Sequence, residues 1–317
     1  LMSENQTDEA LEYLNQVELS PEKLMLEADL YQQINMTEVA IDKLTEAREL
    51  EPNDPIIHFA LAELLYFDGQ YLRATREYEV VLDTGEYEIN GINLFSRMAD
   101  CALQSGNYSD AIQLFDEISE DEMISDDFFK KAIAYEKNDL TQEAIKIMTT
   151  LLSKDPDFIQ GYFYLQSLYE NEKNYPDAIE TGKEGLRLNQ FYKELMVSTG
   201  SLEIEHGDAN EGVELLKKAL EVDNAYHEPL LILSDLFRQE EDYEAIISLL
   251  SYVDEEDLDP VFMWHLAHAY GEEERDTESQ HFYELAYPTL KSQSLFLSDY
   301  YFYLIEIGQK DKAKVLL

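Results

Sequence analysis

Apolar positions along the chain recur every three or four residues, in segments of about a dozen residues that short polar turns separate. Such spacing places the apolar side chains of each segment on one side of an α-helix. In the segment that starts at Pro21, for example, Leu24, Ala28 and Tyr31 follow one another at intervals of four and three residues. The pattern therefore predicts an all-α fold built from short amphipathic helices.

The helices come in pairs that repeat at an almost constant period. Every second helix carries a small residue near its start, and these residues are Ala40, Ala74, Ala111, Ala144, Ala178, Gly212, Ala245, Ser279 and Ala313. Their successive separations are 34, 37, 33, 34, 34, 33, 34 and 34 residues. Small side chains let neighbouring helices approach closely, and the larger apolar residues around them fill the remaining space. The period predicts helix pairs that stack on one another.

The repeated unit resembles the tetratricopeptide repeat, a helix–turn–helix of 34 residues. In the first complete unit the matching residues are Leu24, Ala28, Tyr31, Ala40, Leu44, Ala47 and Pro52, and in the third they are Phe95, Ala99, Gly106, Tyr108, Ala111, Phe115 and Ile118. The resemblance implies a right-handed α-solenoid, a superhelix of stacked helix–turn–helix repeats. It also implies a concave groove, lined by the first helix of each pair, that holds a peptide.

The repeats cover nearly the whole chain as one continuous solenoid. We expect eight tetratricopeptide-like repeats in residues 21–293, preceded by a partial repeat with only the second helix in residues 1–20. Residues 294–317 read as an incomplete repeat, and its uncovered apolar face predicts either a longer natural protein or end-to-end pairing of two copies. Three extra residues around positions 84–90 lengthen one turn between repeats. Gly106, just before a second helix, is expected to adopt the left-handed conformation that ends the first.

Charge narrows the possible partners. The chain has 23 basic and 68 acidic side chains, a formal net charge of −45, and 45% of its residues are apolar. The apolar fraction is too high for a disordered polyanion, and the negative charge would repel nucleic acid and anionic membrane surfaces. The single cysteine, Cys101, excludes an intrachain disulfide and is expected to be a small buried hydrophobe. We expect a cytoplasmic protein.

Candidate binding residues follow from the groove positions that the resemblance implies. They are Phe59, Arg97, Phe129, Lys130, Phe163, Tyr164, Trp264 and His265. The aromatic side chains would offer pockets for apolar anchors of a partner, or, alternatively, would fill the contacts between helices. Arg97 and Lys130 would either bind an anion or offset nearby acids, for which Glu63, Asp100 and Glu136 are the candidates.

Reaction chemistry has little support in the sequence. His265, His268 and Glu272 share one helical face, but nothing resembles a metal-binding motif and no second histidine helix completes a site. Nucleophile and phosphate-binding motifs are also absent from the sequence, so we name no catalytic residue, metal or cofactor.

Two functional hypotheses remain from the sequence. The first is a non-catalytic scaffold or adaptor that binds protein or peptide segments in its groove, with partners that are basic or carry apolar anchors. The second is a ligand-responsive regulator, similar to the bacterial peptide-pheromone sensors, which changes the shape of the superhelix when a short peptide binds.

Overall fold

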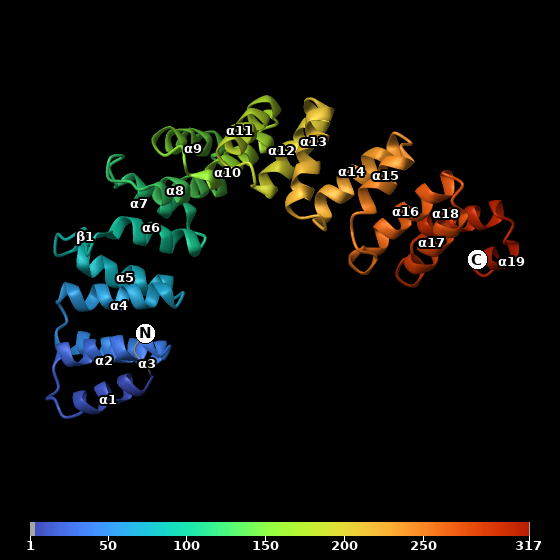
Figure 1. Cartoon of the computed structure of the whole chain (residues 1–317). Coiled ribbons are helices and arrows are strands. Elements are labelled where there is room, and N and C mark those ends of the chain that lie inside the picture. Colours follow the sequence, from blue (N-terminus) through green and yellow to red (C-terminus); the bar gives the residue numbers. More distant parts are fainter. Residues whose placement is uncertain (1–3, 317) are drawn as a thin grey trace. The chain divides into compact units, whose positions relative to one another are not determined.

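A computed structural model describes residues 4–316 and consists almost wholly of helices (Figure 1). The first helices of the successive pairs are α2 (Pro21–Gln33), α4 (Pro55–Phe67), α6 (Leu94–Gln104), α8 (Ser125–Lys137), α10 (Ile159–Asn171), α12 (Lys193–His206), α14 (His227–Gln239), α16 (Pro260–Glu272) and α18 (Ser294–Glu306). The second helices are α1 (Glu4–Leu14), α3 (Thr37–Leu50), α5 (Tyr71–Leu82), α7 (Tyr108–Asp116), α9 (Thr141–Lys154), α11 (Tyr175–Leu188), α13 (Ala209–Val222), α15 (Tyr243–Leu250), α17 (Asp276–Leu290) and α19 (Lys310–Ala313). Residues 1–3 and 317 of the expected terminal segments lie outside the described residues. The all-α prediction is confirmed.

Contacts divide the chain into two compact units, residues 1–161 and 162–317, which are described separately. Within each unit, helices that follow one another in the sequence pack side by side, as α4 does with α5 and α12 with α13. First helices also contact the first helix of the next pair, for example α6 with α8 and α12 with α14. We call the surface that these helices form the first-helix face, and the opposite surface the second-helix face.

Local signals in the sequence fix where the helices begin and turn. Asp54 caps α4, since its Oδ1 atom accepts hydrogen bonds from the backbone N–H groups of Ile56 and Ile57 at 2.8 and 3.3 Å. Most turns inside a pair contain one residue with positive φ, as expected for Gly106, whose φ is 76°. The others of this kind are Asn35, Gly69, Asp139, Lys173, Glu241, Glu274 and Gly308. Polar residues therefore adopt the left-handed conformation at several turns where glycine is missing.

The small residues of the second helices lie where helices cross. All of them except Ala245 are buried, and at position 245 the neighbouring Ile246 is fully buried instead. At Gly212 an added Cβ atom would lie 2.5 Å from the carbonyl oxygen of Gly200 in α12. The backbones of α12 and α13 are thus closer together than any side chain would allow.

The three extra residues form a feature that the sequence analysis did not predict. Strands β1 (Glu88–Ile89) and β2 (Ile92–Asn93) pair antiparallel, and Asn90 and Gly91 form the connection with φ values of 54° and 78°. Two consecutive residues with positive φ are the requirement of a tight hairpin turn, which asparagine and glycine meet most easily. The expected lengthened turn is therefore a short β-hairpin.

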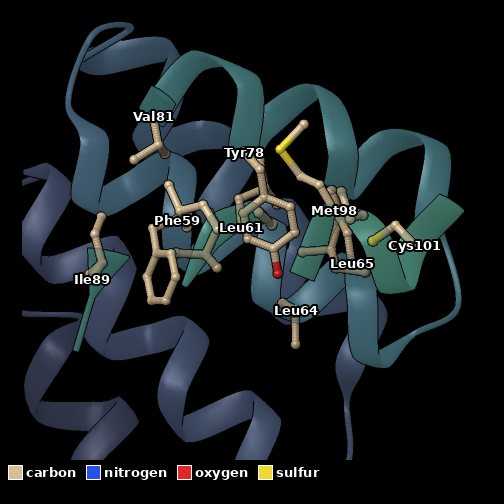
Figure 2. Close-up of a cluster of buried hydrophobic side chains, with 14 of the residues drawn as sticks. Phe59, Leu61, Leu64, Leu65, Tyr78, Val81, Ile89, Met98 and Cys101 are labelled. Atoms are coloured by element: carbon tan, nitrogen blue, oxygen red, sulfur yellow. The ribbon is translucent and has the colours of Figure 1, made fainter. Parts of the chain in front are cut away.

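The hairpin adds Ile89 to the core of the N-terminal unit. Figure 2 shows Ile89 near Phe59 and Val81, with Met98 and Cys101 contributed by α6. Cys101 is fully buried, which confirms its expected role as a small hydrophobe. Burial raises the pKa of its thiol to about 11, so the reactive thiolate is scarce at neutral pH.

Candidate functional site

Arg97 of α6 is held by side chains of the preceding pair. Its Nε and Nη2 atoms donate to the two carboxylate oxygens of Glu63 at 2.9 and 3.1 Å. Its guanidinium also lies over the rings of Tyr66 and Phe67, 4.7 and 5.7 Å from their centroids. Both the charge and the flat face of Arg97 are therefore engaged within the N-terminal unit.

Lys130 of α8 is paired in the same way. Its Nζ atom lies 2.6 Å from Asp100 and 2.9 Å from Asp126, and the hydroxyl of Tyr66 donates to Asp100 at 2.5 Å. Burial alone would lower the pKa of Lys130, but the hydrogen bonds to the two carboxylates raise it above the ordinary value. The prediction that Arg97 and Lys130 offset acids is confirmed for Glu63 and Asp100.

Glu136, the third acid expected to offset these cations, lies 3.1 Å from Lys137. We call Glu63, Arg97, Asp100 and Lys130 the ion-pair ladder. These four side chains join α4, α6 and α8 across the first-helix face of the N-terminal unit. An incoming anion would have to compete with carboxylates that are already in place.

The aromatic candidates of the N-terminal unit are partly or wholly used in packing. Phe59 is 7% exposed, and its ring lies 6.4 Å from that of Tyr78 in the core. Phe129 is partly buried, with its ring 5.5 Å from that of Phe158. These contacts leave little of the Phe59 ring for a partner to touch, whereas part of Phe129 stays accessible.

Trp264 and His265 belong to a polar cluster near the C-terminal end. The indole N–H of Trp264 and the hydroxyl of Tyr283 donate to Oδ2 of Asp299 at 2.6 and 2.7 Å. His268 lies 3.1 Å from the other oxygen of the same carboxylate. His265 is buried, and its Nδ1 atom is 3.0 Å from the hydroxyl of Ser234. The cluster ties α16, α17 and α18 together.

This cluster predicts a pH-dependent contribution to stability. The hydrogen bond to Asp299 raises the pKa of His268 above its ordinary 6.5 in the folded state. The extra stability is therefore complete below about pH 6.5 and is lost as the pH rises through the folded pKa. We expect His268→Gln to lower the free energy of unfolding more at about pH 5.5 than at about pH 8.5. Urea unfolding followed by the fluorescence of Trp264, the single tryptophan, measures this difference. An equal loss at both pH values would contradict it.

The first-helix face of the C-terminal unit contains a cavity of about 350 Å³. It is lined by Phe163 and Glu170 of α10, by Glu194, Val197, Ser198, Ser201, Leu202 and Glu205 of α12, and by Tyr226 and Glu228 at the start of α14. Phe163 is 37% exposed, and its ring lies 5.9 Å from that of Tyr192. Of the eight candidates named from the sequence, Phe163 is the one that lines this cavity, while Tyr164 next to it is half-buried.

The electrostatics of this cavity are strongly negative. Among the described residues, Glu170, Glu194 and Glu228 have no ion pair with a lysine or arginine, and Glu205 lies 3.5 Å from His206. Burial, together with the carboxylates of Glu228 and Glu194, raises the pKa of Tyr226. The cavity thus presents exposed carboxylates beside aromatic and aliphatic surface, a combination suited to a cation with an apolar neighbour.

Comparison with known proteins assigns the family. The TPR repeat-containing protein YpiA of Bacillus subtilis strain 168 is 34% identical over 301 residues, which are 94% of this chain and 70% of that protein. The chain belongs to the YpiA-like tetratricopeptide repeat family. The family's sequence models match residues 32–86 and, for its C-terminal repeats, residues 260–317, and a general tetratricopeptide repeat matches residues 128–157.

A solved structure supports the arrangement of this YpiA-like chain. The C-terminal part of a TPR repeat-containing protein from Cytophaga hutchinsonii matches with a TM-score of 0.61 and 15% identity, over 76% of this chain and 98% of that one. At this identity the likeness shows the fold alone, and it confirms the expected helical solenoid. The YpiA-like chain is therefore a repeat scaffold of the kind that mediates protein interactions.

The YpiA-like chain has a second, larger cavity that the sequence analysis missed. This cavity, of about 570 Å³, lies on the second-helix face of the C-terminal unit, and its lining is Lys217, Leu220, Glu221, Asn224, Leu230, Phe237, Ala245, Ser248, Leu249 and Tyr252. It lies beside α15, which has 8 residues and is followed by the 3₁₀ turn η1 (Glu255–Asp257). The second helices of the two neighbouring pairs, α13 and α17, have 14 and 15 residues. A short helix leaves apolar surface uncovered.

Within residues 4–316, no three histidine, cysteine, aspartate or glutamate side chains are grouped so that they could hold a metal ion. In the same range, no helix combines the length and the apolar composition needed to cross a bilayer. Neither finding adds a site to the cavities described above.

Proposed function

We propose that this YpiA-like chain is a non-catalytic scaffold that binds a segment of a partner protein in the first-helix cavity of its C-terminal unit. The observation that carries the proposal is the lining itself, in which the partly exposed ring of Phe163 lies among carboxylates with no lysine or arginine partner. Aromatic side chains in desolvated pockets are the usual energetic centre of a protein interface. The tetratricopeptide fold also supports a protein or peptide as the ligand.

The first-helix face of the N-terminal unit is less suited to binding a partner segment. There the ion-pair ladder already neutralises the charges of α4, α6 and α8, and displacing it would leave partly buried charges unpaired. Among the residues that the structure describes, no lysine or arginine forms an ion pair with Glu194 or Glu228 in the first-helix cavity of the C-terminal unit. Binding there requires no internal ion pair of these residues to be broken.

The non-catalytic assignment rests on the side chains of the cavity. Its lining offers the hydroxyls of Ser198 and Ser201, but no histidine or lysine among the lining residues could activate them as nucleophiles. The four carboxylates of the lining are exposed to solvent. The proposed role is therefore recognition.

Two substitutions of the same kind test which face binds. Ser198 lines the first-helix cavity and Ser248 lines the second-helix cavity, so Ser198→Trp and Ser248→Trp fill each cavity in turn. We expect cross-linking in cells followed by mass spectrometry to lose partners at least about tenfold with Ser198→Trp and to keep them with Ser248→Trp. Circular dichroism and the melting temperature check that both variants fold.

The reverse pattern would move the function to the second-helix face and contradict the proposal. Small-angle scattering of the partner complex tests the second hypothesis from the sequence. A bound segment that changes the radius of gyration of the chain would make it a ligand-responsive regulator, whereas an unchanged radius supports a passive scaffold.

A further inference from the structure

We infer that the segment bound in the first-helix cavity carries two cationic side chains about five residues apart, with an apolar side chain between them. This inference rests on the proposed function and specifies its ligand. It uses three features of the cavity: the sign of its charges, their positions along α12, and the rings between them.

The sign of the charges favours a cationic ligand. The lining contains four glutamates, Glu170, Glu194, Glu205 and Glu228, and no lysine or arginine. All four side chains are exposed, so a ligand can reach them without unfolding the helices. The nearby Lys193 is paired with Asp223 at 2.8 Å, and its charge is therefore already offset. An anionic segment would be repelled, whereas lysine or arginine would gain an ion pair.

The carboxylates lie toward the two ends of the cavity. Glu194 is in the first turn of α12, and Glu205 is in its last turn, eleven residues later. Glu228 of α14 follows Glu194 by one repeat of 34 residues, so it lies at the same end of the cavity as Glu194. Glu170 of α10 corresponds in the same way to residue 204, next to Glu205, so it lies at the other end. Each end therefore receives a carboxylate from a neighbouring first helix. At a rise of 1.5 Å per residue, the two ends are about 16 Å apart.

Apolar surface lies between these ends. Phe163 precedes Val197 by one repeat, and both line the cavity together with Leu202 and the ring of Tyr226. An extended peptide advances about 3.3–3.6 Å per residue, so two side chains about 16 Å apart are about five residues apart. By the helical rise of about 1.5 Å per residue, Val197 lies about 4.5 Å along α12 from Glu194, so a ligand side chain one or two positions from the cation at that end would face the partly exposed ring of Phe163. An aliphatic side chain there would gain free energy from burial against this ring.

The chain itself shows this recognition chemistry beside the cavity. The ammonium group of Lys193 lies 4.6 Å from the centroid of the Tyr226 ring while it pairs with Asp223. A lysine that enters the cavity from a ligand would meet the same kinds of group, an aromatic ring and a carboxylate of Glu194 or Glu228.

Synthetic peptides test the spacing directly. The probe is a fluorescein-labelled nonapeptide of glycine, alanine and serine that has two lysines five positions apart and one leucine between them. We expect fluorescence anisotropy at low salt to show at least about tenfold tighter binding than for the same composition with adjacent lysines. Affinity should fall as salt is raised, because exposed charges are screened beyond about 8 Å at physiological ionic strength.

Matched charge reversals locate the binding. Glu194→Lys with Glu228→Lys is expected to weaken the best peptide at least about tenfold. The control is Glu184→Lys with Glu244→Lys, which changes the net charge equally at exposed positions of the second helices α11 and α15 and should leave the affinity within about twofold.

Several results would overturn the inference. These are no binding at millimolar peptide, equal affinity for both spacings, equal losses in both double variants, or tighter binding of a longer peptide whose lysines are eleven positions apart, which would indicate a helical ligand. If partner capture still depends on Ser198 while cationic peptides fail, the ligand class is wrong and the scaffold proposal stands. If capture does not depend on Ser198, the scaffold proposal itself fails.

Discussion

Replacing Gly212 with alanine is expected to lower the free energy of unfolding of the C-terminal unit by about 2–3 kcal/mol. The added Cβ atom would lie 2.5 Å from the carbonyl oxygen of Gly200 and 2.9 Å from the backbone nitrogen of Ile204. Both are backbone atoms of α12, so no side chain can rotate away and the two helices must separate. In an unobstructed helix the same change would stabilise by about 0.5–1 kcal/mol, which makes the expected loss diagnostic of close contact.

Gly271 in α16 provides the matched control. An added Cβ atom there would lie 3.3 Å from the hydroxyl of Ser279 and 3.4 Å from the ring of Tyr303, both of which are side-chain atoms. We expect Gly271→Ala to change the free energy of unfolding by less than about 1 kcal/mol in either direction. Urea unfolding followed by circular dichroism measures both variants. Similar losses at the two positions would mean that helix crossing is not what requires glycine at position 212.

The fold could be predicted from the sequence because the same contact is made once in every repeat. A small residue near the start of each second helix marks the crossing, and its period of about 34 residues is visible without knowledge of the contacts. The repeat that contains Ala245 is irregular, and this too can be seen in the sequence. Ala245 comes one residue early, and the next residue, Ile246, is the buried side chain. A packing contact that recurs in every repeat requires a small residue that recurs at the same interval in the sequence.

The hairpin shows what a search for periods overlooks. Asn90-Gly91 stands between Ile89 and Ile92, which is a strong local signal for a tight hairpin turn. This signal occurs once and breaks the repeat, so the 34-residue period registers it only as extra length. The structure of an insertion follows from the turn-forming residues within it and not from the repeat period.

The candidate site was harder to predict from the sequence. The position of a residue within its repeat indicates which face of the solenoid it lies on, but not which side chains it contacts there. The pairs Glu63–Arg97 and Tyr66–Asp100 are each 34 residues apart, so adding one repeat length to each polar position would have revealed both contacts. Lys130 follows Asp100 by only 30 residues, so the same step would have missed that ion pair. The same step relates Glu194 to Glu228 and would have drawn attention to the acidic cavity. The second-helix cavity depends on where α15 ends, and no residue type marks that end clearly.

The ion-pair ladder provides the second large effect expected in this protein. Asp100 is 3% exposed and accepts hydrogen bonds from Lys130 at 2.6 Å, Tyr66 at 2.5 Å and Gln104 at 3.3 Å. We expect Asp100→Ala to lower the free energy of unfolding by about 3 kcal/mol, because the partly buried donors of Lys130 and Tyr66 lose their shared, buried acceptor. Asp126→Ala removes the other carboxylate of the same lysine, but Asp126 is 55% exposed, so its loss should cost less than about 1 kcal/mol.

The pH dependence of the two variants identifies the cause of the difference. Burial alone would raise the pKa of Asp100, but the hydrogen bonds from Lys130 and Tyr66 hold it below its ordinary 3.8 in the folded state. The stability that Asp100 contributes is therefore complete well above pH 3.8 and is lost as the pH falls through the folded pKa. Urea unfolding at neutral pH and near pH 3 should show the gap between wild type and Asp100→Ala shrinking in acid. A gap that stays constant, or an Asp126→Ala loss as large as that of Asp100→Ala, would show that the buried carboxylate does not hold the ladder together.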